Sequence, residues 1–116
     1  MPTRLLVAKE LAEIFGVLSH PDRIRIIEEL RAGEKDVSTL ALALGLEAPR
    51  ISQHLRLLKM NRMVVERREG RRHFYHLTNP EMASWIVYGL VFVEQRIEGI
   101  TPDSIEEVRR LWGENP

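Results

Sequence analysis

The chain has 116 residues with 17 basic and 17 acidic side chains, 44% hydrophobic content and no cysteine. This length fits a single domain, residues 1–116, whose small core would benefit from subunit association. The missing cysteines exclude disulfides, thiolate metal sites and cysteine redox sensing. The longest apolar run, within 82–93, is shorter than the about 20 residues that cross a bilayer. Because the N-terminal segment mixes charged and apolar residues, unlike a signal peptide, we expect a cytoplasmic protein.

Two helices are predicted before residue 35. Apolar residues recur at helical spacing over 4–18, which predicts the first helix. Ser19 can cap a second helix, and Asp22 follows near the positive end of that helix. The expected buried stripe of the second helix is Ile24, Ile27 and Leu30.

A pair of closely joined helices is predicted over about 36–60. The first begins at Asp36 or Ser38, Gly45 fits the left-handed position past its end, and Pro49 suits the first turn of the second. The inward positions of the second helix, at i, i+4 and i+7, are Ile51, Leu55 and Leu58. The residues left on its outer surfaces are Arg50, Ser52, Gln53, His54 and Arg56. This pattern fits a helix-turn-helix, although many helical hairpins share it.

The residues that follow change from helical to strand periodicity. β-branched residues begin at Val64, Gly70 marks a turn, and residues 72–77 return as a second strand. They predict a β-hairpin over about 63–77 with arginines clustered at its tip. A helix-turn-helix followed at once by a basic hairpin is a winged helix, and this combination is more specific than either half. We therefore expect a mainly α-helical fold with a small β-hairpin.

Positive charge is concentrated in these two elements. The window 49–76 holds eight basic and two acidic residues, a net charge of +6, which leaves −6 on the rest of this neutral chain. Phosphate backbones are the commonest partner for such a footprint. Double-stranded DNA is therefore the expected partner.

The winged-helix interpretation assigns DNA contacts to both elements. In the second helix of the pair, beginning at Pro49, Gln53 can read adenine and Arg50 can read guanine, whereas Ser52 and Arg56 would meet phosphates. The expected hairpin contacts, to phosphates or the minor groove, are Arg67, Arg68, Arg71 and Arg72. The alternative for both sets is that they are ordinary solvated residues. His54 lies on the same helix and could contact DNA as well. The alternative for His54 is that it packs beside its helix or bonds to a nearby backbone group.

A fifth helix is predicted from the start at Asn79-Pro80-Glu81 to about residue 98. Its first part is apolar nearly all round, more than its own domain can cover, so a second subunit is expected against it. An aromatic stripe on this helix consists of Trp85, Tyr88 and Phe92. Such a stripe is usually core or dimer interface, and the alternative is an effector pocket for a hydrophobic ligand.

A last helix starts near residue 102 and ends at Gly113. Its apolar stripe is predicted to be Ile105, Val108 and Leu111. It could pack on its own subunit or across a dimer.

The histidines and the remaining polar residues predict no metal site and no enzyme. His73 and His76, three apart in a strand, point to opposite faces, and no pair has helical i, i+4 spacing. We interpret these two and His20 as surface or partly buried residues, and we expect no metal and no other cofactor. A nucleophile–base–orienter set, a glycine-rich phosphate loop and a metal triad are all missing from the sequence.

Three segments resemble the ArsR/SmtB family of bacterial winged-helix repressors. They are residues 18–27, residues 51–58 with a serine-glutamine-histidine-leucine run, and the hairpin residues 69–72 and 75–77. The resemblance covers roughly 5–98. It implies a homodimer that binds an operator as a transcriptional repressor, and it implies a role for His54 near the DNA backbone. It also implies a dimer interface between the first and fifth helices, where we expect Leu5, Leu11, Met82, Trp85, Ile86, Gly89 and Val93.

The chain departs from this family where many members sense metals. Residues 35–39, which correspond to a cysteine pair in many members, contain no cysteine. Helix 80–98, where other members bind zinc through Asp, His and Glu, contains no histidine. Neither of these metal sites is therefore expected.

The sequence thus predicts a homodimeric repressor whose operator is an imperfect palindrome with half-sites about one helical turn apart. The alternative is a winged helix used only for protein binding, with its basic hairpin against an acidic partner. The effector remains open in either case: it could be a small organic molecule, a metal bound through oxygen and nitrogen ligands, or none.

Overall fold

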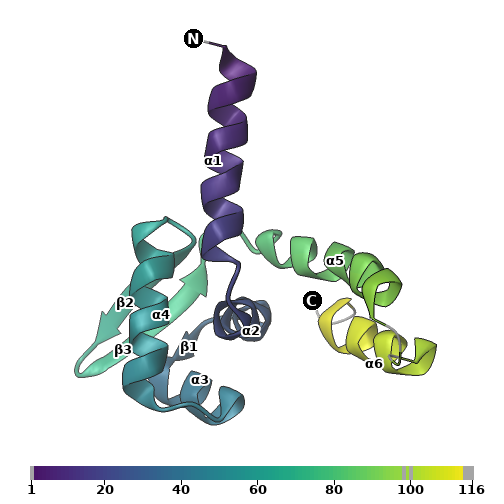
Figure 1. Cartoon of the computed structure of the whole chain (residues 1–116). Coiled ribbons are helices and arrows are strands. Elements are labelled where there is room, and N and C mark those ends of the chain that lie inside the picture. Colours follow the sequence, from purple (N-terminus) through teal and green to yellow (C-terminus); the bar gives the residue numbers. More distant parts are fainter. Residues whose placement is uncertain (1, 98, 100, 114–116) are drawn as a thin grey trace.

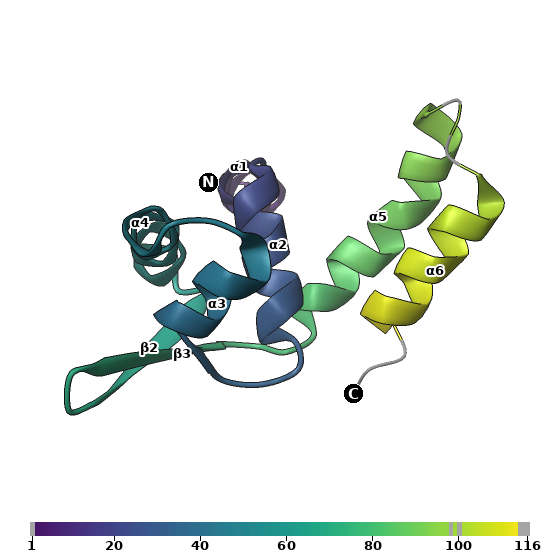
Figure 2. The same ribbon diagram turned by 90° about the horizontal axis from the view of Figure 1, so that it is seen from below.

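Six helices and three strands make up residues 2–97, 99 and 101–113, the part of the chain that is described by a computed structural model (Figure 1). In chain order they are α1 (Thr3–Val17), α2 (Pro21–Leu30), β1 (Lys35–Asp36), α3 (Val37–Leu44), α4 (Ala48–Met60), β2 (Val64–Glu69), β3 (Arg72–Leu77), α5 (Met82–Arg96) and α6 (Pro102–Gly113). The hairpin β2–β3 lies beside α4, and α5 and α6 lie together on the other side of the molecule (Figures 1 and 2). The predicted helical fold with a small hairpin is confirmed.

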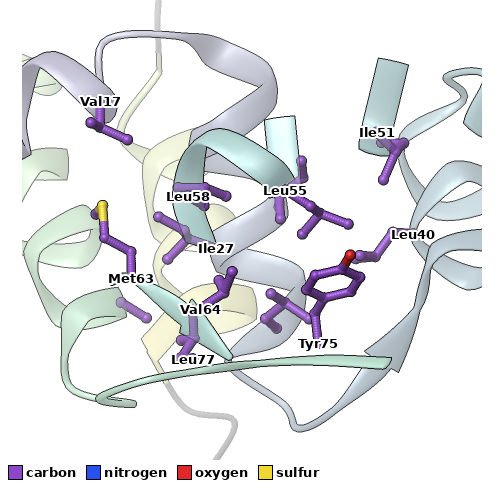
Figure 3. Packing of buried hydrophobic residues seen from close by; sticks show 13 residues of the cluster. Val17, Ile27, Leu40, Ile51, Leu55, Leu58, Met63, Val64, Tyr75 and Leu77 are labelled. Atoms are coloured by element: carbon purple, nitrogen blue, oxygen red, sulfur yellow. The ribbon is translucent and has the colours of Figure 1, made fainter. Parts of the chain in front are cut away.

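The core lies where α2, α3 and α4 meet the hairpin (Figure 3). Its largest fully buried side chains are Ile26, Ile27, Leu40, Ile51, Leu55 and Leu58. The inward stripe predicted for α4 is therefore confirmed at all of its positions. In α2 the stripe is displaced, since Ile26 is fully buried whereas Ile24 is half-buried and lines an apolar cavity beside α5 and α6.

The strands form an antiparallel sheet in the order β1-β3-β2. β2 and β3 pair from Val64 opposite Leu77 to Glu69 opposite Arg72. Gly70, at a φ of 63°, permits the tight turn between them, as its position in the sequence predicts. The strand β1, which pairs with β3, has no counterpart among the predicted elements, because two residues are too few to show an alternating pattern.

The start of α2 differs from the prediction that Ser19 caps it. His20 is the cap, and its Nδ1 accepts a hydrogen bond from the backbone N–H of Asp22 at 3.1 Å. The Ser19 hydroxyl instead donates to the carbonyl of Gly16. Ser19 therefore forms a hydrogen bond with a backbone carbonyl in the last turn of α1, and the next residue, His20, caps α2.

Helix α1 projects away from the rest of the chain (Figure 1). Val17 is its one buried residue, and Phe15 is 54% exposed. A helix of 15 residues is marginal without packing, and the described residues leave most of α1 uncovered.

Helix α5 begins at Met82 rather than at residue 80. Asn79 Oδ1 accepts a hydrogen bond from the backbone N–H of Glu81 at 3.0 Å, which forms a turn before the helix. Along the helix, Tyr88 is 72% exposed and Phe92 is 66% exposed. The expectation that its own domain cannot cover this helix is confirmed.

Helix α6 packs against α5 of the same chain (Figure 2) and buries Ile105 to 4% exposure. The predicted stripe is wrong at its end, because Leu111 is 61% exposed. The next residue, Trp112, faces the cavity beside α5 instead. None of the described helices combines the length and the apolarity that crossing a bilayer requires.

Candidate nucleic-acid interface

The outer face of α4 is formed by its polar residues. With the inward stripe held in the core, the predicted DNA-contacting residues of α4 that are turned to solvent are Pro49, Arg50, Ser52, Gln53 and Arg56. This face follows the tight turn after α3, which Gly45 allows at a φ of 67°, as predicted. It presents an amide and guanidinium groups, which can form paired hydrogen bonds with base edges.

Arg50 is tied to α2 by an ion pair. Its Nη2 lies 2.6 Å from Oδ2 of Asp22, whose side chain is 16% exposed. Partial burial would raise the pKa of Asp22, but the hydrogen bond from His54 and the charge of Arg50 lower that pKa below its ordinary value. Asp22 is therefore ionised at neutral pH, and its carboxylate holds the Arg50 guanidinium against α2.

His54 packs against α2, and its side chain is 12% exposed. Its Nε2 lies 3.1 Å from Oδ2 of Asp22, and its Nδ1 lies 3.4 Å from Nη1 of Arg23. Burial lowers the pKa of His54, so its imidazole is mostly neutral at pH 7. This geometry gives His54 a packing role that positions α4 on α2.

The hairpin β2–β3 is the wing of the winged helix. Two of its four arginines that are predicted to contact DNA are held by acidic residues. Arg67 donates from Nη2 to Oε1 of Glu34 at 2.7 Å, and Arg72 donates from Nη2 to Oδ2 of Asp36 at 2.6 Å. Both guanidinium groups lie over the ring of Phe74, at 4.6 and 4.7 Å from its centroid. These contacts fix the shape of the hairpin and neutralise part of its charge.

Asp36 joins the hairpin to the helix-turn-helix. Its Oδ1 accepts a hydrogen bond from the backbone N–H of Thr39 at 2.8 Å and so caps α3. Of the two predicted starts, the structure therefore selects Asp36. The hydrogen bonds from Thr39 and then from Arg72 keep the pKa of Asp36 far below its usual range. This ionised carboxylate links the first turn of α3 with β3.

Arg68 and Arg71 are the other two wing arginines. Both are exposed, and neither forms an ion pair within residues 2–97, 99 and 101–113. Arg68 pairs with His73 in the sheet register, and Arg71 follows Gly70 in the turn. These two residues carry the hairpin charge that is available to an anionic partner.

Glu66, which the sequence pattern did not single out, ties the hairpin to the end of α4. Its Oε1 accepts from Nζ of Lys59 at 2.8 Å, and its Oε2 lies 2.6 Å from Nδ1 of His73 and accepts from the Tyr75 hydroxyl at 2.9 Å. Hydrogen bonds from Lys59 and then His73 lower the pKa of Glu66 to about 2. A signal was present, because Glu66 stands two residues after the buried Val64 and so shares its face of β2.

We expect Glu66→Gln to remove a pH-dependent part of the stability. Because the pKa of Glu66 falls from 4.5 to about 2 on folding, ionised Glu66 stabilises the fold above pH 4.5, and this contribution is lost as the pH falls toward 2. At neutral pH it amounts to about 2 kcal/mol after allowance for solvent screening. Denaturant unfolding at pH 7 and pH 3 should show a gap between wild type and Glu66→Gln that narrows at the lower pH.

The control for this prediction is Glu107→Gln, because Glu107 is exposed and forms no ion pair with any described residue. This variant should follow the wild type at both pH values. A gap between wild type and Glu66→Gln that stays constant with pH would contradict the ionic role of Glu66.

The residues predicted for the dimer interface differ in their exposure. On the surface lie Leu5 at 47%, Leu11 at 39%, Trp85 at 42% and Val93 at 36%. Half-buried are Met82, Ile86 and Gly89. The aromatic rings of α1 and α5 already meet within one chain, since the Phe15 and Trp85 centroids are 5.8 Å apart.

An apolar cavity of about 520 Å³ lies between α5, α6 and the junction of α1 with α2. Trp85 lines it together with Ile86, Gly89 and Val93, so α6 covers part of the α5 face predicted for the dimer. Tyr88 shares a separate hollow of about 460 Å³ with Trp85, and Phe92 lines neither. Neither of these two hollows is lined by all three residues of the predicted aromatic stripe.

A tight helix-turn-helix with a polar outer face, followed by a paired hairpin with free arginines, defines a winged helix-turn-helix DNA-binding domain. Residues 20–65 match the model of this class described as a bacterial regulatory protein of the arsR family. The chain belongs to the arsR family of bacterial regulatory proteins. It is a DNA-binding transcriptional regulator, and the resemblance found in the sequence is confirmed.

Two relatives and one solved structure illustrate the match. The transcriptional regulator KmtR of Mycobacterium tuberculosis is 33% identical over 90 residues, which are 78% of this chain and 69% of the relative. The arsenical resistance operon repressor of Staphylococcus xylosus is 33% identical over 91 residues, which are 78% of this chain and 86% of the relative. The homodimeric winged helix-turn-helix domain of Mb0332 from Mycobacterium bovis is 25% identical, with a TM-score of 0.70 over 87% of this chain and 94% of that domain.

Proposed function

We propose that this protein is a cytoplasmic homodimer that represses transcription by binding an inverted-repeat operator. Helix α4 enters the major groove, and the hairpin β2–β3 meets the flanking backbone. The observation that carries this proposal is the exposure of Arg50 and Gln53 on the outer face of α4, on the same domain as a hairpin with the free cations Arg68 and Arg71.

A second copy of the chain is the proposed cover for α1 and α5. The large apolar side chains left exposed on these helices are Leu5, Leu6, Val7, Leu11, Phe15, Trp85, Tyr88, Val91, Phe92 and Val93, and Ile97, just after the end of α5, is exposed as well. So many exposed large apolar side chains on two helices are typical of an interaction surface. A two-fold dimer places two copies of α4 about one helical turn of DNA apart, so the operator is an imperfect palindrome.

The contacts divide by the chemistry of the side chains. Gln53 and Arg50 read bases, and Arg50 exchanges its Asp22 partner for the base edge. Ser52 and Arg56, together with the helix start at Pro49, contact the phosphate backbone. This division rests on the outward positions of all five residues on α4.

The wing arginines divide in the same way. Arg68 and Arg71 contact phosphates, because neither has an acidic partner within the described residues. Arg67 and Arg72 keep their acidic partners and hold the hairpin in shape. His54 acts as a positioning residue for α4.

Selection of bound duplexes from a random DNA pool at near-physiological salt tests the function. We expect enrichment of an inverted repeat. Salt-sensitive binding without enrichment would replace the proposal by a non-specific DNA-binding role. Failure to bind any duplex at low salt would favour the winged helix as a protein-binding module.

We expect Arg71→Ala to weaken binding to operator and scrambled duplexes alike. Loss of one phosphate contact should reduce the slope of log K against log salt by about 1. Titrations from about 50 to about 200 mM salt give this slope. Lys9→Ala is the matched control, because Lys9 is an exposed cation on α1. An unchanged slope for Arg71→Ala would place its side chain away from the DNA.

A further inference from the structure

Three metal-binding side chains from two helices meet beside the outer face of α4. His20 and Asp22 stand at the start of α2, and His54 stands in the middle of α4. One nitrogen of each imidazole and one carboxylate oxygen all lie within 4.8 Å of one another. The two histidines are 34 positions apart in the sequence. The prediction of no metal site considered only local spacing and therefore could not detect this cluster.

The distances leave little movement for the formation of a metal site. Oδ2 of Asp22 lies 3.1 Å from Nε2 of His54 and 3.9 Å from Nδ1 of His20. In a tetrahedral site with metal–ligand distances of about 2.1 Å, neighbouring ligand atoms are about 3.4 Å apart. Small side-chain rotations would therefore bring all three atoms onto one ion.

The side chains offer two imidazoles and one carboxylate, which suit zinc, cobalt and nickel better than the all-oxygen cations magnesium and calcium. His54 and Asp22 are 12% and 16% exposed, whereas His20 is 37% exposed, so the site is open on the His20 side. We propose that His20, Asp22 and His54 bind one divalent transition-metal ion, with water in the remaining position.

Such an ion must compete with contacts that the free protein makes. Nη2 of Arg50 lies 2.6 Å from the same Asp22 oxygen, and Nδ1 of His20 accepts the backbone N–H of Asp22. Nη1 of Arg23 lies 3.4 Å from Nδ1 of His54. The ion displaces Arg50 from Asp22. Its bonds to the imidazole nitrogens of His20 and His54 must therefore offset the loss of this ion pair.

This displacement couples the site to the outer face of α4. Arg50 leaves α2 when the ion binds, so the ion changes which groups α4 presents. The consequence for DNA rests on the proposed function, whereas the metal site itself does not. Both can therefore be tested separately.

The test is a titration of the untagged full chain with Zn²⁺ alone, by calorimetry and without DNA. We expect one ion per chain and a loss of affinity of about tenfold or more in His20→Asn and in His54→Gln. Asparagine can still cap α2, and glutamine can still donate to Asp22, so both variants keep the fold. His76→Gln is the control, because His76 is exposed, lies on β3 and is not part of the cluster. The site would be overturned if the wild type showed no saturable Zn²⁺ binding, or if both site variants bound Zn²⁺ as tightly as the wild type.

Competition with Arg50 gives a second measurement. Arg50→Gln should bind Zn²⁺ several-fold more tightly than wild type, whereas Arg56→Gln should not. An unchanged affinity in Arg50→Gln would overturn the displacement. In nitrogen-15 spectra of the wild-type imidazoles, Zn²⁺ should shift His20 and His54, and shifts confined to His73 and His76 would overturn the assignment. Because none of these readouts contains DNA, their failure is distinct from a failure of the random-pool selection.

Discussion

Replacement of Gln53 by alanine should weaken binding to the selected operator by about 1–3 kcal/mol, which is roughly 5- to 150-fold. Gln53 is exposed on the outer face of α4, and its amide can both donate to and accept from one adenine. Loss of this pairing removes discrimination at one base position in each half-site. Fluorescence anisotropy with operator and scrambled duplexes measures the effect.

The scrambled duplex separates base reading from general affinity. Gln53→Ala should bind it as the wild type does, whereas Arg71→Ala should lose affinity for both duplexes. A repeated selection with Gln53→Ala should yield a palindrome with one symmetric pair of positions relaxed. Equal losses on both duplexes would remove Gln53 from the base-reading set.

Gln53 is a cleaner probe than Arg50. Removal of the Arg50 side chain eliminates a base contact but also leaves the partly buried Asp22 carboxylate without its guanidinium partner. The hydrogen bond from His54 to Asp22 remains, but loss of the ion pair with Arg50 costs stability in its own right. The measured change in Arg50→Ala therefore combines a loss of DNA contact with a change in how α4 packs on α2.

Local sequence patterns predict much of the fold. The positions i, i+4 and i+7 of α4 identify Ile51, Leu55 and Leu58 as core, because a helical period fixes which residues share a face. Gly45 and Gly70 mark the turns, since each has a positive φ that glycine adopts without strain. Patterns of this kind need no knowledge of what packs against the element.

The site depends on pairings that no local pattern encodes. Arg67 and Arg68 are adjacent and chemically identical, yet only Arg67 reaches Glu34, because alternate strand residues face opposite sides of the sheet. His54 meets Asp22 across a helix–helix contact, 32 positions away. The α6 stripe shifts from Leu111 to Trp112 for a similar reason, since its position is set by α5.

Replacement of Phe92 by glutamate should convert the dimer to a monomer and weaken operator binding by about 100-fold or more. Phe92 is 66% exposed on α5, so a carboxylate there is solvated in the single chain and costs that chain little. In a dimer that covers α5, the same carboxylate is buried without a partner, which costs several kcal/mol. Light scattering gives the mass, and anisotropy gives the affinity.

Two further variants locate the interface. Leu42→Glu is the control for mass: Leu42 is 85% exposed on α3, a helix outside the proposed interface, so this variant should remain dimeric. Leu11→Glu on α1 should dissociate the dimer as Phe92→Glu does, since the two helices are proposed to share one interface. If Leu11→Glu dissociates the dimer but Phe92→Glu does not, the second subunit packs on α1 and leaves the Phe92 face of α5 open. Dimers of unchanged mass in both variants would place the interface elsewhere, and the two copies of α4 would then have no reason to lie one helical turn apart.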